Sequence, residues 1–441
     1  MNIPVATVGA ATAGVLDGLE RLQGPVTVVR RCTELTELVA VSQSGIVRAA
    51  VVADDAGDLT AALVERLAAA GVALVALTDD PVLRQRLNAM RIANTPSGVD
   101  PGALAELLAA AVQALDQDLQ GRTAAGSNAL ADPAAAFGAG SAVPGAADAA
   151  EPEGRRGTVT AVWGPAGSPG RTTLAVNLAA EAAAAGAGVL LIDADTYGSS
   201  VAVSLGLLDE SAGVAQACRL ADQGLLDDAA LRRISASVSL RGQRLAVLTG
   251  ITRSDRWVEL RPAALAGVLD TARRVADLTI VDCGFSLETD EELSFDTMAP
   301  RRNASTLLVL DAADTVYAVG AADSVGVPRL VRALSDLAAA VPAVEPQVVL
   351  NKVRASSVGR QPESQLRGAW ERFGPGGEIA AFLPADYDAA DASLLSGTAL
   401  LETAPASVLR AAIAELAGVQ VPGRRRGTRR TRQSDLWRIR G

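Results

Sequence analysis

Short apolar runs and amphipathic stretches alternate along the first 117 residues. The apolar runs predict strands, and they lie at residues 5–10, 26–31, 48–55 and 72–80. The stretches between them repeat apolar residues at helical spacing, at 15–22, 35–43, 59–71 and 81–91, and a further one closes the region at 102–117. We interpret these four strands and five helices as five strand–helix units, which predict a doubly wound α/β sheet over residues 1–117.

A second strand–helix series begins at Thr158 and continues to about residue 420. Its apolar runs predict strands at 158–163, 188–195, 245–250, 277–284, 305–314, 346–353 and 379–386. Helical spacing is clearest at 172–186, 262–276 and 325–341. Nearly all of the runs are continuously apolar and several end in aspartate, which is typical of a parallel sheet with functional groups at its carboxyl edge. We therefore predict a mostly parallel sheet with helices on both faces over residues 157–420.

The two series are joined by a segment of different composition. Residues 118–156 are rich in Ala, Gly, Pro and Ser and show no sustained apolar period. This composition predicts a flexible linker between two domains. A surface loop punctuated by Gly and Pro is the alternative, and the length of the segment favours the linker.

Charge is unevenly distributed along the chain. The formal net charge is -10, which argues against a general nucleic-acid coat. Residues 421–441 form a basic tail, in which eight arginines and one aspartate give about +7. The arginines of residues 424–440, beside Leu436, Trp437 and Ile439, suit contact with an anionic membrane surface or with DNA phosphates. A disordered, solvated tail is the alternative.

The cysteines and the N-terminal residues indicate the compartment. Cys32, Cys218 and Cys283 are scattered and the chain has no histidine, which argues against a structural zinc site or a disulfide framework. The first residues lack the basic and apolar regions of a signal peptide. Every long apolar run is interrupted before the roughly 20 residues of a membrane span. We predict a cytoplasmic protein that contacts a membrane only at its surface.

The segment GPAGSPGRTT at residues 164–173 has the outline of a phosphate-binding loop, because it follows a predicted strand and opens a predicted helix. Its glycines let the backbone turn and approach an anion, and the amides at the helix N-terminus supply donors. We expect Thr172 to hold Mg²⁺ and Thr173 to contact an inner phosphate. The predicted phosphate-loop residues are Gly164, Gly167, Ser168, Gly170, Arg171, Thr172 and Thr173.

Arg171 departs from the usual loop, which carries lysine at this place. A guanidinium pairs with phosphate oxygens, but its planar fork is larger than an ammonium group and is not interchangeable with it. Pro165 and Pro169 also stiffen the loop and remove two amide donors. A Gly- and Pro-rich turn that only joins a strand to a helix is the alternative interpretation of this segment.

Polar side chains stand at the ends of three further predicted strands. Asp193 and Asp195 end one strand, and Asp282 ends another, where a carboxylate can orient a magnesium-bound water. Asn351 follows a third strand, where an amide side chain can pair with a base edge. Taken singly, each aspartate is typical of a helix cap or a turn. Their shared place at strand ends predicts one site for a nucleotide and magnesium.

The first 117 residues resemble a response-regulator receiver. Asp54 and Asp55 end the third predicted strand, where a receiver has its phosphoacceptor. A working receiver also has an acidic pair after its first strand and a lysine after its fifth, and this chain has GAATA and IANTPSG at those places. We therefore predict a pseudo-receiver that serves in docking or dimerisation.

The segments WGPAGSPGRTT, LLIDADTYGSS, DLTIVDCG, NKV and LPAD together resemble the MinD/ParA family of deviant P-loop ATPases, over about residues 158–420. The leading receiver-like region makes the chain most similar to the CpaE/TadZ branch. The resemblance implies a P-loop fold that binds ATP and Mg²⁺, with Asn351 and Pro384 in the adenine pocket. It also implies Asp195 and Arg171 as catalytic residues, Asp195 positioning the attacking water, and a metal site at Thr172, Asp193 and Asp282.

Two lysines of the family pattern are missing. Arg171 replaces the loop lysine, and Ala166 stands where the family has a signature lysine that reaches across a dimer. Lys352 is the only lysine in the chain, and it lies in the NKV segment. Loss of a charge clamp on the phosphates slows phosphoryl transfer strongly. Hydrolysis of ATP to ADP and phosphate therefore stays open, with binding and slow or absent turnover as one outcome.

Three hypotheses for function follow. The first is a nucleotide-dependent spatial regulator, in which ATP favours a homodimer that recruits pilus, secretion or cell-division proteins. Asp195 and Asp282 favour it, because an abandoned site need not keep magnesium carboxylates. The second is a non-catalytic localisation scaffold with a degenerate nucleotide site, which Ala166 and Arg171 favour. The third is a DNA-partitioning ATPase that uses the basic tail.

Overall fold

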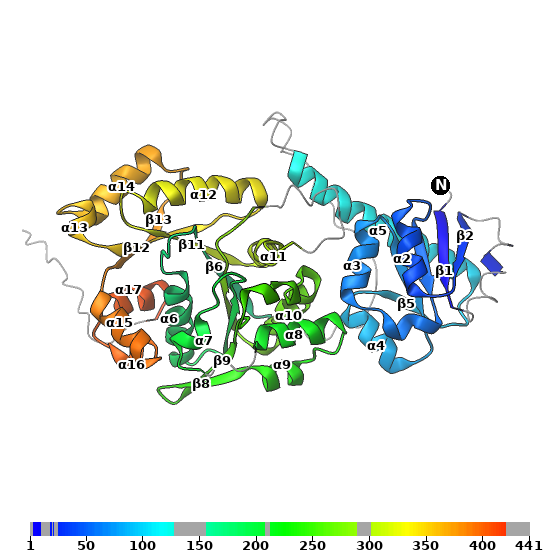
Figure 1. The fold of residues 1–441 in the computed structure, drawn as a ribbon, viewed down its shortest axis with the longest axis horizontal. Helices are drawn as coiled ribbons and strands as arrows, with labels where there is room; N and C mark the ends of the chain where they lie inside the picture. The colour runs from blue at the N-terminus through cyan, green and yellow to red at the C-terminus, as the bar shows by residue number, and fades with distance from the viewer. Residues whose placement is uncertain are drawn as a thin grey trace, which may run out of the picture.

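The structure is a computed structural model, and it describes residues 3–9, 18–19, 21, 25–127, 156–207, 212–288 and 301–419. These residues fold into two α/β units, each built on its own sheet (Figure 1). The first unit comprises the described residues up to 127, and the second unit comprises those from 156 onward. Within the described residues, no helix is both long and apolar enough to cross a membrane.

The first unit holds a five-stranded parallel sheet in the order β2-β1-β3-β4-β5. This is the strand order of flavodoxin-like, doubly wound folds. The strands are β1 (Ile3–Val8), β2 (Val26–Cys32), β3 (Ala49–Val52), β4 (Ala73–Leu77) and β5 (Ala93–Thr95). The helices are α2 (Leu35–Gln43), α3 (Ala61–Ala69), α4 (Pro81–Ala89), α5 (Pro101–Ser127) and the short 3-10 helix η2 (Asp54–Asp58).

Apolar side chains cover both faces of this first sheet. Leu104 and Leu108 of α5 pack on one face, and Leu38, Leu67 and Leu87 of α2, α3 and α4 pack on the other. Helices on both faces are what define a doubly wound sheet. The predicted receiver-like, doubly wound fold is therefore confirmed.

Other predictions for this part of the chain have a different outcome. Helix α5 continues to Ser127, past the boundary predicted at residue 117, because Leu, Gln, Arg and Ala favour helix and outweigh the cost of Gly121. The predicted helix at 15–22 lies mostly outside the described residues. Residues 128–155 of the predicted linker and the whole basic tail also lie outside them. The segment with Asp54 and Asp55 forms η2 directly after β3.

The second unit holds an eight-stranded sheet in the order β13-β12-β11-β6-β10-β7-β9-β8. All of its strand pairs are parallel except β8 with β9. The strands are β6 (Thr158–Trp163), β7 (Val189–Ala194), β8 (Ala236–Leu240), β9 (Gln243–Leu248), β10 (Leu278–Cys283), β11 (Thr315–Ala321), β12 (Gln347–Val353) and β13 (Ile379–Pro384). The predicted mostly parallel sheet is confirmed.

Helices cover both faces of the second sheet (Figure 1). One core cluster joins the sheet to α8 (Gly213–Asp222), α9 (Asp228–Ile234), α10 (Pro262–Val275), α11 (Ala304–Ala312), α12 (Gly326–Ala340) and α14 (Pro362–Phe373). The other joins it to α6 (Arg171–Ala184), α7 (Val201–Ser204), α15 (Tyr387–Ser396), α16 (Leu400–Thr403) and α17 (Val408–Leu416). The short helices η5 (Ser254–Glu259) and α13 (Ala355–Val358) complete the unit.

The strand predicted at 305–314 is wrong, because these residues form helix α11. The middle of the run, at residues 307–310, is continuously apolar, and a short run of that kind fits a buried helix as well as a strand. Thr306, Val309 and Leu310 are all buried, which is the spacing of one helix face. The strand comes next, at β11, and the sequence analysis also missed the edge strand β8, whose side chains alternate in exposure.

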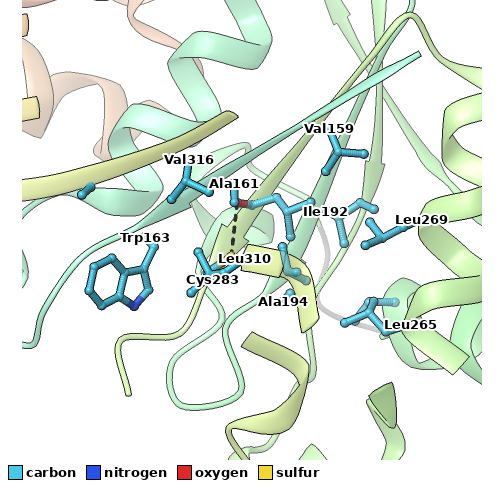
Figure 2. Packing of buried hydrophobic residues seen from close by; sticks show 14 of the residues in the cluster. Val159, Ala161, Trp163, Ile192, Ala194, Leu265, Leu269, Cys283, Leu310 and Val316 are labelled. Atoms are coloured by element: carbon cyan, nitrogen blue, oxygen red, sulfur yellow. Dashed lines mark hydrogen bonds between the residues drawn. The ribbon is translucent and has the colours of Figure 1, made fainter. Parts of the chain in front are cut away.

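Strand β6 lies at the centre of the second sheet and is buried on both faces. Val159, Ala161 and Trp163 point to the face that carries α10 and α11, where Leu265 and Leu310 meet them (Figure 2). The residues between them face α6. Because β6 is packed on both faces and paired on both edges, its position in the sheet is fixed. The predicted phosphate loop therefore begins at a defined place, between the ends of β10 and β11.

Candidate nucleotide site

The predicted phosphate loop joins β6 to α6, and three of its positions accept only glycine. A Cβ atom at Gly164 would lie 2.2 Å from the carbonyl oxygen of Val319. Gly167 has φ 106° and Gly170 has φ 99°, a region that L-residues rarely adopt. A Cβ atom on Gly170 would also lie 2.3 Å from Nδ2 of Asn351. The loop is thus built for close backbone approach and ends at the N-terminus of α6.

Arg171 is the first residue of α6, and its guanidinium turns back into the loop. Nη1 donates to the carbonyl oxygen of Gly164 at 2.9 Å, and Nη2 donates to Oδ2 of Asp195 at 3.2 Å. The guanidinium carbon lies 5.9 Å from the ring centroid of Phe285. The side chains of Arg171 and Asp195 are only 13% and 6% exposed, so solvent screens this ion pair little.

Thr172 and Asp282 lie together, as predicted. The Thr172 hydroxyl donates to Oδ2 of Asp282 at 2.6 Å, and the hydroxyl of Ser200 lies 3.1 Å from that of Thr172. Oδ1 of Asp282 is buried and has no hydrogen-bond partner among the described residues. Burial, with the charge of Asp193 in addition, raises the pKa of Asp282 well above its usual range. A cation next to Thr172 would supply the partner that Oδ1 of Asp282 lacks.

The carboxylate of Asp193 accepts hydrogen bonds from backbone amides of the neighbouring segment. Its Oδ2 accepts from the amides of Ser200 at 2.9 Å and Val201 at 3.0 Å, so it holds the start of α7. Its Oδ1 accepts from the amide of Asp195 at 3.2 Å. Burial raises the pKa of Asp193 to about 6, although these amides lower it. Within the described residues its carboxylate is fully engaged by backbone donors.

Asp195 is also held on both oxygens. Besides the pair with Arg171, its Oδ1 accepts from the amides of Tyr197 at 2.8 Å and Gly198 at 3.2 Å. The ring of Tyr197 lies 4.7 Å from that of Phe285, centroid to centroid. The carboxylate predicted to position water is therefore part of the loop scaffold in this state.

Asn351 reaches the phosphate loop from the end of β12. Its Nδ2 donates to the carbonyl oxygen of Pro169 at 2.8 Å, and its Oδ1 accepts from the amide of Lys352 at 2.8 Å. Lys352 has φ 61°, and its Nζ donates to the carbonyl oxygen of Ser168 at 2.7 Å. Two neighbouring side chains of β12 thus fasten the tip of the loop.

A cavity of about 380 Å³ lies over the loop and the N-terminus of α6. Most of the predicted phosphate and base residues line it, while Gly164, Gly167, Asp193 and Asp282 lie outside its lining. The lining residues are Ser168, Pro169, Gly170, Arg171, Thr172, Thr173, Asp195, Gly198, Ser200, Asn351, Lys352, Pro384, Ala385, Asp386, Tyr387, Ala390 and Leu409. Residues between 168 and 200 and residues between 351 and 409 of the second unit therefore line the same cavity.

The sequence analysis missed several residues of this site. Tyr387 lines the cavity directly after the LPAD segment, so an extension of that segment by one residue finds it. Phe285 directly follows the DLTIVDCG segment, and Ser200 ends the LLIDADTYGSS segment but was given no role. Arg329 of α12 donates through Nη1 to the carbonyl oxygen of Ala166 at 3.1 Å, so a cation stands beside the place of the missing signature lysine.

The residues present fit a magnesium ion of the kind that binds with a nucleotide. The described residues contain no group of three or more His, Cys, Asp or Glu placed to hold a metal. Mg²⁺ keeps several waters and binds through one or two carboxylates together with phosphates, so it needs no such group. The unpartnered Oδ1 of Asp282 and the hydroxyl of Thr172 provide the oxygen atoms for that arrangement.

Solved structures similar to this chain include several MinD and ParA proteins. The cell division ATPase MinD of Pyrococcus furiosus is 19% identical over 59% of this chain and 97% of its own, with a TM-score of 0.45. A ParA family ATPase of Chlorobium tepidum is 21% identical over 60% of this chain and 99% of its own, with a TM-score of 0.45. The MinC:MinD cell division complex of Aquifex aeolicus matches at 17%, over 61% and 99%, with a TM-score of 0.43.

A comparison with curated proteins found no match. The family model for the CobQ/CobB/MinD/ParA nucleotide binding domain matches residues 160–395, which is more than half of the chain. The matched range begins in β6 and ends in α15, so it contains the loop, the three aspartates and Asn351. The chain therefore belongs to the CobQ/CobB/MinD/ParA nucleotide-binding domain family.

Proposed function

We propose that this protein binds ATP with Mg²⁺ and acts as a nucleotide-dependent spatial regulator of the CpaE/TadZ kind. The observation that carries the proposal is a cavity lined by the phosphate loop together with Asn351 and Pro384. A hollow of this kind with few convergent polar groups is the usual form of a small-molecule site.

The loop end of the cavity suits the phosphates. The amides at the N-terminus of α6 point toward an anion there, and the helix dipole favours negative charge. Thr172 and Asp282 would hold the Mg²⁺, which neutralises charge on the phosphate oxygens when bound. Thr173 lines the same end and would contact an inner phosphate.

The part of the cavity beside Asn351 and Pro384 suits the base. Asn351 uses one N–H of its amide on Pro169 and one lone pair of its oxygen on Lys352. An asparagine side chain has two N–H donors and two lone pairs, so one donor and one acceptor stay available. These two groups match the paired donor and acceptor on the edge of adenine, and Pro384 and Tyr387 supply apolar walls.

Hydrolysis is a separate step, and the site favours slow turnover. Asp195 has both oxygens engaged, and it must leave Arg171 before it can orient a water. Ala166 brings no cation to the phosphates, and Arg329 meets only its carbonyl oxygen. We propose that Asp195 and Arg171 act in catalysis only after nucleotide has rearranged the loop.

The partners belong to the same proposal. ATP favours a homodimer, and the dimer recruits pilus, secretion or cell-division proteins. Support comes from the family and from the receiver-like first unit, which adds a second surface to the nucleotide-binding unit. The basic tail at 424–440 lies outside the described residues, and contact of this tail with a membrane or DNA stays a prediction.

Calorimetry with the full chain tests the proposal. We expect ATP to bind with a Kd in the micromolar range, on the order of -8 kcal/mol, and to bind more weakly without Mg²⁺. Asp282→Ala and Arg171→Ala should both weaken Mg-ATP binding, and Asp282→Ala should also remove most of the effect of Mg²⁺. Asp336→Ala is the matched control, because Asp336 is an exposed carboxylate on α12.

A non-catalytic scaffold is the second candidate function. The buried pair of Arg171 with Asp195 favours it, because Arg171 then binds a carboxylate of the protein itself where it would otherwise bind a phosphate. On this hypothesis neither ATP nor ADP binds at millimolar concentration, with or without Mg²⁺. That result would reject the nucleotide-dependent regulator and leave localisation to the receiver-like unit.

A further inference from the structure

Arg171 is the point where three segments of the site meet. It donates to the carbonyl oxygen of Gly164 at the start of the loop and pairs with Asp195 after β7. It also lies over the ring of Phe285 after β10, and that ring stacks at a tilt on Tyr197. One side chain therefore ties together the segments that surround the phosphate end of the cavity.

We propose that Arg171 and Asp195 form a latch that holds the site in a nucleotide-free state. ATP must replace the carboxylate of Asp195 as the partner of Arg171, so Asp195 acts as a positioning residue that sets nucleotide affinity. This inference rests on the proposed function, since it concerns the same site. It gives Asp195 a role that is independent of water activation.

The latch explains why arginine suits this position. The two terminal nitrogens of the guanidinium bond different partners, Gly164 through Nη1 and Asp195 through Nη2. The planar fork holds these two donors at a fixed angle, whereas a lysine ammonium is a single point charge on a flexible stem. Arginine can thus join the loop to the β7 segment in one geometry.

The surroundings allow the latch to open. When Arg171 leaves, Asp195 keeps two hydrogen bonds from backbone amides, at Tyr197 and Gly198, so its charge does not become unsolvated. Nε of Arg171 is buried, and no acceptor for it lies within the part of the chain that the structure describes. Both side chains line the cavity, so an entering phosphate can offer oxygen atoms to a donor that lacks one.

A simpler explanation must be separated from the latch. Removal of a carboxylate that holds no metal ion beside a phosphate site lowers the repulsion of the phosphates and can raise nucleotide affinity by itself. Asp386 also lines the cavity, and its Oδ2 accepts from Ser407 rather than from Arg171. Asp386→Asn therefore makes the same change of charge at the same cavity without opening the latch.

The test is a double-mutant cycle for Mg-ATP binding to the full chain, measured by calorimetry. Asp195→Asn should tighten binding by about fivefold or more, within the usual range of coupling between sites. In an Arg171→Gln background the same change should give no gain, and Asp386→Asn, which changes the charge at the cavity without opening the latch, should tighten binding clearly less than Asp195→Asn does. Damage to the fold weakens binding, so a tighter Kd is not a structural side effect. Thermal unfolding checks that each variant is folded.

The outcomes separate the two proposals. If the native chain binds Mg-ATP and Asp195→Asn gives no gain, the latch is rejected and the proposed function stands. The latch is also rejected if the gain persists with Arg171→Gln or appears equally with Asp386→Asn. Binding only after Asp195→Asn supports the latch in its strongest form. If no variant binds nucleotide at millimolar concentration, the proposed function falls, and the latch falls with it.

Discussion

Gly170 carries two constraints at once, and they can be tested separately. Its φ of 99° lies in the left-handed region, and a Cβ atom would lie 2.3 Å from Nδ2 of Asn351. We predict that Gly170→Ala destabilises the fold by about 1–3 kcal/mol and also weakens Mg-ATP binding by at least tenfold, because Asn351 must leave the loop. Chemical denaturation and calorimetry measure the two effects.

Gly186 provides the matched control for this change. It lies just past the other end of α6 with φ 97°, and a Cβ atom there meets nothing within 4 Å. Gly186→Ala should therefore have the backbone cost alone, about 1–2 kcal/mol, and leave the nucleotide Kd unchanged. Equal effects of the two substitutions on binding would show that the Asn351 contact does not matter.

The sequence predicted which residues gather at the site better than what each one contacts. Thr172 beside Asp282, and Asn351 beside the loop, follow from their places at the ends of parallel strands, since those ends share one sheet edge. The pair of Arg171 with Asp195 depends on the rotamer of a long side chain in a folded loop. No local pattern encodes such a choice, so the sequence analysis gave Asp195 a catalytic role and Arg171 phosphate-binding and catalytic roles, and it did not pair them.

Helix α6 positions the site, and a buried ion pair fixes it to α17. Arg410 donates to Glu181 through Nε at 2.6 Å and through Nη2 at 3.0 Å, and the two side chains are 9% and 3% exposed. We predict that Arg410→Ala destabilises the protein by about 3–5 kcal/mol, because it leaves the Glu181 carboxylate buried without a partner. Urea unfolding of the full chain measures the loss.

Two comparisons test whether the cost arises from the abandoned charge. Replacing both residues with apolar ones, Glu181→Leu with Arg410→Met, should recover most of the stability, because no unpaired charge then stays buried. The exposed pair of Arg253 with Asp255 is the control, and Arg253→Ala there should cost less than about 1 kcal/mol. A double variant as unstable as Arg410→Ala would mean that packing, and not charge, holds α6 to α17.

At the scale of elements, the sequence predicted strands and helices where the apolar pattern had one interpretation. Helices α6, α10 and α12 lie where helical spacing indicated them. The run at 305–314 is continuously apolar only over residues 307–310, which is too short to reveal a period, and packing against β6 and β10 decides that it is a helix. Long-range packing also selects the edge position of β8, which its own residues do not encode.

At the scale of the whole molecule, the two units contact each other through residues that belong to none of the sequence motifs. Helices α3 and α4 of the first unit face α8 and α10 of the second (Figure 1). The amide of Ala62 donates to Oδ1 of Asp222 at 2.7 Å, so a carboxylate of α8 stands at the N-terminus of α3. Arg91 pairs with Asp270 of α10. These residues form a contact between the two units of the same chain, and docking of the first unit to other proteins stays a prediction.

Asp222 stabilises this contact, because its carboxylate accepts from the amide of Ala62 at the N-terminus of α3 and meets the positive end of the helix dipole there. The pair of Arg91 with Asp270 is largely exposed and contributes little by itself. We predict that Asp222→Lys separates the two units and speeds hydrogen exchange of the first amides of α3, while the core of each unit stays protected. Asp228→Lys is the control, since Asp228 pairs with Arg274 within the second unit. Unchanged exchange at Ala62 in Asp222→Lys would show that other contacts hold the units together.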